Sequence, residues 1–200
     1  MSILTEDRIK KRLKGPKNRL VVTPILSPKQ ISGSSIDVRL GNQFIVFRMH
    51  MLGVFKPYNT SPGDLRKMQE RQIVRFGHPF VLHPGMLALG STFEYLSMPP
   101  DLSCYVEGRS SWARLGLQIA TATVVEPCFK GTPTLELSNV GTIPIELYPG
   151  VRIAQLIFHD AEPPRVSPYG KHRKYDCPVG PHFSKVHLDE DGKIFAQEPE

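Results

Sequence analysis

Short apolar runs separated by turn residues make up most of the chain after residue 20. Three of these runs span residues 36–40, 44–47 and 80–82, and the Pro-Gly pairs at 84–85 and 149–150 are typical turn signals. No long helical pattern separates the runs. This spacing favours a mainly antiparallel β fold.

The clearest strand pattern lies between residues 134 and 158. In residues 134–138 two leucines alternate with polar residues, so the leucines share one face of a strand. The run 151–158, which follows a Pro-Gly turn, is apolar on both faces. We expect this second run to form a strand buried inside a barrel or sandwich.

The N-terminal segment has a different pattern. Residues 4–14 predict a short helix, which Gly15 and the following proline end. Seven basic residues lie between Arg8 and Arg19. They are interpreted more simply as a solvated helix face than as an anion-binding patch.

The composition changes again after His159, where prolines and charged residues replace the apolar runs. Such a segment is typical of an extended tail, which is either disordered or folded over an anionic ligand. We therefore expect one β-rich domain over residues 1–160, followed by a tail over residues 161–200.

The overall composition narrows the class of partner without choosing one. The chain has 200 residues, a formal net charge of +6 and a pI of about 9.3. This basic surplus favours polyanions such as phosphorylated metabolites, nucleic acid or a membrane surface. No apolar stretch approaches the roughly 18 residues of a membrane span, and the acidic N-terminus is unlike a secretory signal. Three cysteines without a CxxC pair indicate a reducing cytoplasm rather than a disulfide framework.

The segment 107–116 carries the first candidate chemistry. Its two serines precede a helix-compatible stretch and would cap it, leaving free N–H groups beside Arg109 and Arg114. That arrangement suits phosphate groups. The alternative is an ordinary capped turn whose arginines are solvated.

Two carboxylates are further candidates. Glu136 stands in mid-strand between two leucines, where a carboxylate is disfavoured. If its face lines a cavity, desolvation would raise its pKa and suit it to general acid–base work. Glu126, at the end of the preceding strand, could bind a sugar hydroxyl or orient water. The alternatives are a solvent-facing strand glutamate and a surface turn acid.

Metal and nucleotide-loop motifs are absent from the sequence. It has no HxE or PCxxC segment, which zinc-dependent deaminases use to hold the metal, and no HExxH. It also has no Walker loop, GxGxxG or GxSxG. We therefore expect no metal held by protein ligands.

Several segments, taken in order, resemble the dCTP deaminase branch of the dUTP diphosphatase-like superfamily. The resemblance covers roughly residues 30 to 185 and is most specific in the GRSSxARLGL run. It implies a distorted antiparallel β-barrel of jelly-roll type, assembled as a homotrimer with active sites between subunits. The matching segments are residues 35–41, 83–85, 107–117, 134–139 and 149–156, with weaker matches at 174–175, 180–181 and 184.

The resemblance also implies a reaction and roles for named residues. The reaction is hydrolysis of dCTP to dUTP and ammonia without zinc, with Mg²⁺ arriving on the triphosphate. Glu136 corresponds to the catalytic glutamate that moves protons between water, N3 and the leaving amine, and Ser110 and Arg114 to residues that position the water and stabilise charge. The resemblance implies that the tail over residues 161–200 closes over the active site, with Tyr169 and Lys174 covering the base and the phosphates. The implied nucleotide-binding residues are Arg109, Ser110, Ser111, Trp112, Ala113, Arg114, Glu126, Thr134, Leu135, Glu136, Gln155, Tyr169 and Lys174.

The chain departs from the family pattern in places that affect specificity. The hairpin between residues 117 and 126 is slightly short, which leaves open whether Ala122 or Thr123 reads the base. Cys128 replaces a usual glycine, Glu126 a usual aspartate, and Pro178 stands where a nucleotide-contacting glutamine is expected.

Three functions from different classes are compatible with the sequence. The favoured one is a zinc-independent dCTP deaminase, because dUTP diphosphatases carry an apolar residue at the position of Glu136. The second is a dUTP diphosphatase or a bifunctional enzyme that forms dUMP and pyrophosphate, which the short hairpin and the strand 152–156 favour. The third is a non-catalytic nucleotide- or nucleic-acid-binding module, against which stand the single tryptophan and an aromatic content of 8%. We expect no nucleic-acid or membrane partner.

Overall fold

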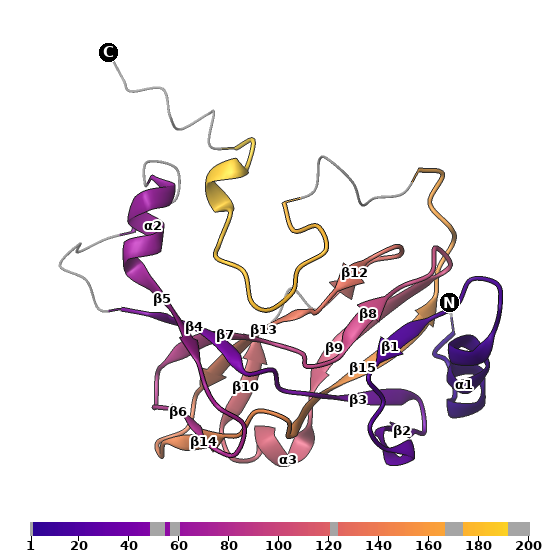
Figure 1. Ribbon diagram of the computed structural model, residues 1–200, viewed down its shortest axis with the longest axis horizontal. Coiled ribbons are helices and arrows are strands. Elements are labelled where there is room, and N and C mark those ends of the chain that lie inside the picture. Colours follow the sequence, from indigo (N-terminus) through magenta and orange to yellow (C-terminus); the bar gives the residue numbers. More distant parts are fainter. Residues whose placement is uncertain (1, 49–54, 57–60, 121–123, 167–173, 192–200) are drawn as a thin grey trace.

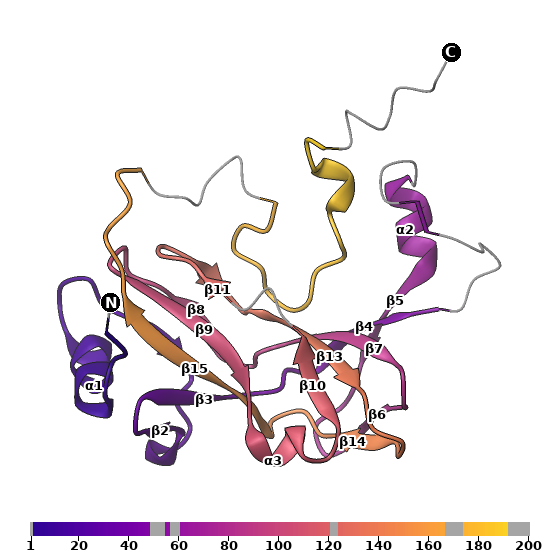
Figure 2. The ribbon, with the colours of Figure 1, turned by 180° about the vertical axis from the view of Figure 1, so that it is seen from behind.

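The computed structural model describes residues 2–48, 55–56, 61–120, 124–166 and 174–191. Two five-stranded sheets dominate it (Figures 1 and 2), and every strand pairing in the described part is antiparallel. The first sheet has the order β11 (Val124–Val125), β9 (Leu102–Gly108), β15 (Arg152–Asp160), β3 (Ser35–Arg39) and β2 (Ile31–Ser32). The second has the order β10 (Leu117–Ala120), β13 (Thr134–Asn139), β7 (Leu87–Ser91), β4 (Gln43–Phe47) and β5 (Gln69–Ile73).

Smaller elements complete the described structure. The short strands are β1 (Val21–Thr23), β8 (Tyr95–Ser97) and β12 (Lys130–Gly131), which form one sheet, and β6 (Phe80–Leu82) and β14 (Ile145–Leu147), which form another. The helices are α1 (Glu6–Lys14), α2 (Pro62–Met68) and α3 (Ser110–Ala113), with 3-10 turns at η1 (Pro28–Gln30) and η2 (Val186–Leu188). The architecture is mainly β, as the sequence predicts.

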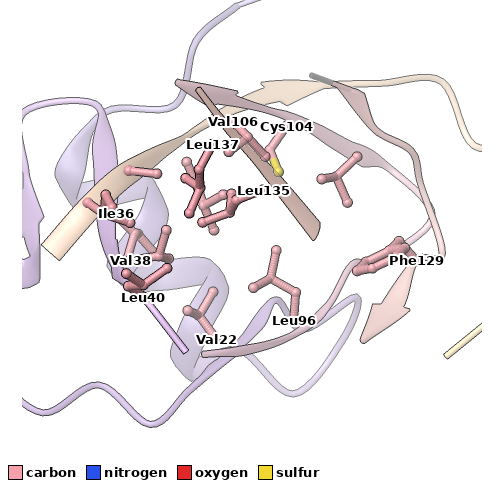
Figure 3. Packing of buried hydrophobic residues seen from close by; sticks show 14 of the residues in the cluster. Val22, Ile36, Val38, Leu40, Leu96, Cys104, Val106, Phe129, Leu135 and Leu137 are labelled. Atoms are coloured by element: carbon pink, nitrogen blue, oxygen red, sulfur yellow. The ribbon is translucent and has the colours of Figure 1, made fainter. Parts of the chain in front are cut away.

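The hydrophobic core lies between the two large sheets. Leu135 and Leu137 of β13 are fully buried, as are Ile36 and Val38 of β3, and Figure 3 shows these side chains directed toward one another. Because side chains alternate along a strand, the same pattern directs Glu136 away from the core. The predicted alternation over residues 134–138 is therefore confirmed.

The strand β15 is central, as expected, because it pairs with both β3 and β9. Its expected burial on both faces is only partly correct. Leu156 and Phe158 are fully buried, whereas Gln155 and Ile157 on the other face keep some exposure. A run of apolar letters cannot distinguish a strand covered on both sides from one whose outer face is open.

The predicted N-terminal helix is confirmed as α1. Its apolar side is anchored by Ile9, which is fully buried. Arg8 forms an ion pair of 2.8 Å with Asp160, and Arg12 pairs with Asp101. Part of the basic cluster therefore fastens the helix to the β domain, and nothing in its contacts requires an anion.

The tail segment 174–191 runs back over the second sheet, close to α2 and β5 (Figures 1 and 2). The backbone N–H of Thr132 donates to the carbonyl of Pro178 at 2.8 Å, and the N–H of Gly180 donates to the Thr132 hydroxyl at 2.8 Å. Arg71 of β5 donates to the carbonyl of Pro181 at 3.3 Å. These bonds fix the described part of the tail to the β domain.

Candidate active site

A cavity of about 750 Å³ opens between the second sheet, strands β9 and β11 of the first sheet, and the tail. Its walls are mostly apolar, and a few polar side chains enter it, which is the usual character of a small-molecule site. The described residues that line it are Phe47, Arg48, Phe55, Leu65, Met68, Gln69, Leu89, Val106, Val124, Val125, Phe129, Pro133, Thr134, Glu136, Tyr175, Pro178, His182 and Ser184.

Glu136 is the only carboxylate among the described lining residues. Its strand lies between β10 and β7, where it pairs with Ala120 and Leu89. Burial raises the pKa of the Glu136 carboxyl, because the charged form loses hydration there. A half-buried carboxyl with a raised pKa is a better proton acceptor than an exposed one and can return the proton it accepts. The conditional expectation about Glu136 is therefore met: its face of the strand lines a cavity.

We expect the burial of Glu136 to oppose folding at neutral pH. Its folded-state pKa is raised, so its favourable contribution is complete below the unfolded value, about 4.3, and is lost as the pH rises through the folded value. Glu136→Gln should therefore be more stable than the wild type at pH 8, and the difference should shrink toward pH 4. The other basic residues of the described cavity wall, Arg48 and His182, are the same in the wild type and in Glu136→Gln, so the comparison isolates the carboxyl.

Urea unfolding of both proteins at several pH values measures this difference. The matched control is Glu107→Gln, a strand glutamate that is exposed. A stability difference for Glu136→Gln that does not vary with pH would show that this carboxyl is as well hydrated as that of Glu107.

Residues 109–114, here called the Arg109 loop, follow β9 of the first large sheet. The side chain of Arg109 donates to the carbonyl of Arg152 at 3.3 Å, and the indole N–H of Trp112 donates to the same carbonyl at 3.0 Å. Asp37 of β3 holds both cations, with 3.5 Å to Arg109 and 3.1 Å to Arg152. The loop is thus fixed to β15 and β3 before any ligand binds.

One local prediction about this loop is wrong. The N-cap of α3 is Arg109, and no side-chain oxygen caps the helix; Ser110 is already its first helical residue. The serine hydroxyls are therefore not used as caps, and Ser110, Ser111, Ala113 and Arg114 are exposed. Exposed hydroxyls and a guanidinium remain suitable for an anionic ligand.

Gln155 belongs to the same side of the molecule as the loop. It lies opposite Asp37 and Glu107 in the sheet register and accepts a hydrogen bond of 3.5 Å from Ser35. The described residues that line the Glu136 cavity include neither Gln155 nor any of residues 109–114. Figures 1 and 2 show α3 at the opposite end of the molecule from the tail segment. A single chain therefore presents the expected site as two separate parts.

The remaining expected residues fall in different environments. Thr134 lines the cavity with Glu136, whereas the Leu135 side chain is fully buried in the core, so only its main chain could contact a ligand. Glu126 is half-buried at the turn after β11, and Lys174 is paired with Asp189. Tyr169, Ala122 and Thr123 lie outside the described residues.

The departures Cys128 and Pro178 have structural explanations. Cys128 has φ 68, a left-handed conformation that glycine adopts without cost, and this backbone geometry accounts for the glycine that the resemblance leads one to expect there. Pro178 is buried, and its ring and carbonyl are so close to Gly131 that a Cβ on Gly131 would lie 2.6 Å from both. Pro178 therefore contributes to docking the tail.

Sequence reasoning missed several cavity residues. Arg48 comes from the end of β4, and Tyr175, His182 and Ser184 come from the tail. The weaker family matches at 174–175, 180–181 and 184 were the local signals near them, and these matches assigned no role to Tyr175 or Ser184. Their convergence on Glu136 depends on long-range chain folding.

Within the described residues, no group of three or more His, Cys, Asp or Glu side chains is arranged to hold a metal ion. In the same part of the chain, no helix combines the length and apolar character needed to cross a membrane.

Comparison with known proteins assigns the family. Residues 3–161 match the model of the dCTP deaminase-like family, so the chain belongs to that family, whose characterised members are enzymes. It is 40% identical to "dCTP deaminase, dUMP-forming" of Methanosphaera stadtmanae over 96% of this chain and 97% of the relative. It is 39% identical to the dCTP deaminase of Natronomonas pharaonis over 94% and 97%.

A solved structure agrees with this assignment. The 2'-deoxycytidine 5'-triphosphate deaminase of Agrobacterium tumefaciens is similar with a TM-score of 0.59 and 26% identity over 78% of this chain. The match spans 47% of the Agrobacterium chain, so the present chain corresponds to about half of that protein's length.

Proposed function

We propose that the protein catalyses the hydrolytic deamination of dCTP. The observation that carries this proposal is the position of Glu136, a half-buried carboxyl with a raised pKa in a cavity large enough for a pyrimidine nucleoside. Family membership and the names of the relatives supply the substrate class.

In this proposal Glu136 moves protons during the exchange of the amine for oxygen. It accepts a proton from water as the water oxygen bonds to C4 of the cytosine, and it delivers that proton to N3. The hydroxyl on C4 then loses its proton through Glu136 to the amine. The C4–N bond breaks, ammonia leaves, and the N3–H of uracil remains.

We further propose that a neighbouring copy supplies the second part of the site. Ser110 and Arg114 would position the water and stabilise charge on the intermediate, yet their loop lies away from the Glu136 cavity of its own chain. A homotrimer with active sites at its interfaces would bring the two parts together. The other assignments are that Arg109, Ser111 and Gln155 bind the phosphates and that Glu126 binds the deoxyribose.

Magnesium would enter as part of the substrate. Mg²⁺ binds phosphate oxygens and retains several waters, so a dCTP–Mg²⁺ complex needs no cage of protein carboxylates. The lack of a metal-binding cluster among the described residues is compatible with this route.

The product separates two candidate functions. The favoured product is free dUTP, which would serve pyrimidine deoxynucleotide synthesis in the cytoplasm. The second candidate is dUMP with pyrophosphate, favoured by the name of the Methanosphaera relative and by the short hairpin between residues 117 and 126.

Chromatography of the reaction with dCTP and Mg²⁺, after treatment with a zinc-selective chelator, tests both candidates. Ammonia and persistent dUTP are expected for a deaminase alone. Matching amounts of ammonia, dUMP and pyrophosphate would assign the bifunctional reaction. Absence of ammonia under every metal condition would contradict both.

A further inference from the structure

A second cavity, of about 390 Å³, lies between α2, β5 and the tail. We name it the basic cavity, because five of its lining residues are basic: Arg66, Arg71, His182, Lys185 and His187. None of the described residues that line it is acidic. Such a concentration of like charge opposes folding unless anions offset it.

Three acidic residues near the two walls are paired with bases that do not line the basic cavity. On the α2–β5 side, Asp64 is paired with Lys67 at 2.9 Å, and Glu70 with Arg48 at 2.8 Å. On the tail side, Asp189 is paired with Lys174. The acids are thus held by bases outside the basic cavity.

The cations affect one another across the gap between the walls. Burial, Lys185 and Arg71 together lower the pKa of His182, so charges from β5 and from the tail both reach this ring. The Nδ1 atom of His187 is buried and has no hydrogen-bond partner in the described part of the chain. A buried polar atom without a partner is costly, and a ligand that hydrogen-bonds to this nitrogen would remove that cost.

We infer that the basic cavity binds a small polyphosphate, either inorganic or carried by a nucleotide. Phosphate oxygens suit the observed donors, since guanidinium and ammonium groups form charge-assisted hydrogen bonds with them and an imidazole N–H also donates. The Ser184 hydroxyl offers a further donor. This site is distinct from the Arg109 loop and does not depend on the deaminase proposal.

A bound anion would also fasten the tail. Arg66 and Arg71 belong to the β domain, while His182, Lys185 and His187 belong to the tail, so one ligand bridges the two. His182, Ser184 and Leu65 line both the basic cavity and the Glu136 cavity. Occupancy of the basic cavity therefore stabilises the wall that closes over Glu136.

Titration calorimetry with inorganic tripolyphosphate tests the inference on the full chain. The wild type is expected to bind tripolyphosphate at the basic cavity. Arg109→Gln should leave this binding in place, and Arg66→Gln/Lys185→Gln should weaken it by about tenfold or more, the effect of losing roughly 1.4 kcal/mol. Arg66→Gln alone, an exposed site, should weaken it in the same direction if the double variant folds poorly. Arg75→Gln, which removes an equal charge from an exposed position outside the lining, should bind as the wild type does.

Two further measurements complete the test. Tripolyphosphate should slow proteolysis of the tail in the wild type and not in the double variant. Titrations of Arg109→Gln with tripolyphosphate and with dUTP identify the source of the phosphate. Equal affinities indicate that the polyphosphate alone is recognised, and tighter binding of dUTP indicates a nucleotide ligand. Unchanged affinity in the double variant, or loss of all binding in Arg109→Gln, would overturn the inference.

Discussion

Glu136→Gln is expected to reduce the rate of ammonia release from dCTP by about 10³-fold or more, the upper range for loss of a general acid–base group. Glutamine preserves the shape of the side chain and fills the same place in the cavity wall. It cannot accept a proton from water, so the attack on C4 loses its base. Dissociation constants for dCTP should change only a few-fold, because the phosphates are expected to be bound elsewhere.

Single-turnover ammonia release and calorimetric binding of dCTP separate the two effects. Glu107→Gln is the matched control, because it makes the same chemical change on an exposed strand position. The control should retain turnover close to that of the wild type. Near-normal turnover of Glu136→Gln, with binding intact, would mean that another group moves the protons.

This expectation joins two properties of one residue. The pKa of Glu136 is raised because the strand directs it into a largely apolar cavity, and this burial opposes folding at neutral pH. If the same substitution stabilises the protein at pH 8 and abolishes turnover, the cost in stability is linked to catalysis. The two experiments use different readouts, so either can fail alone.

How far the sequence predicts the site depends on the range of the interactions. The alternation of leucines with Glu136 is local, and it correctly predicted that the carboxylate is directed away from the core. It could not predict what covers that face, because the covering residues Phe47, Val125 and His182 are distant in the chain. Only the folded topology brings them together.

The Arg109 loop illustrates the opposite case. Its residue types suggested a phosphate site, but the expected serine cap was wrong, because Ser110 adopts helical geometry and Arg109 occupies the cap position. The support from Asp37, which holds Arg109 and Arg152, comes from a neighbouring strand. Local sequence therefore identified the segment, and tertiary contacts decide its conformation.

The tail was predicted from its composition, and the family resemblance implied that it closes over the active site, but the contacts that dock it were not predicted. Gly131 is one glycine among 16, and no feature of the sequence marks it as a contact. In the structure it has φ 141 and lies against Pro178. This contact makes the position of the tail testable by a single substitution.

Gly131→Ala is expected to release the tail and lower kcat/KM for dCTP by about tenfold or more, which corresponds to roughly 1.4 kcal/mol. The new Cβ would lie 2.6 Å from the Pro178 carbonyl oxygen and Cδ, closer than real contacts allow. Since the backbone carbonyl cannot rotate away like a flexible side chain, the tail must move. Tyr175, His182 and Ser184 would then leave the wall of the Glu136 cavity.

The matched control separates tail release from backbone strain. Gly77 also has a positive φ, of 86, but nothing lies within 4 Å of a Cβ placed there. Gly77→Ala should therefore lose only the roughly 1–2 kcal/mol of left-handed strain in stability, with unchanged kcat/KM and unchanged proteolysis of the tail. Limited proteolysis and steady-state kinetics of both variants provide the comparison. If the tail of Gly131→Ala stays as protected as that of Gly77→Ala, Pro178 does not hold the tail in place, and closure over Glu136 must depend on other contacts.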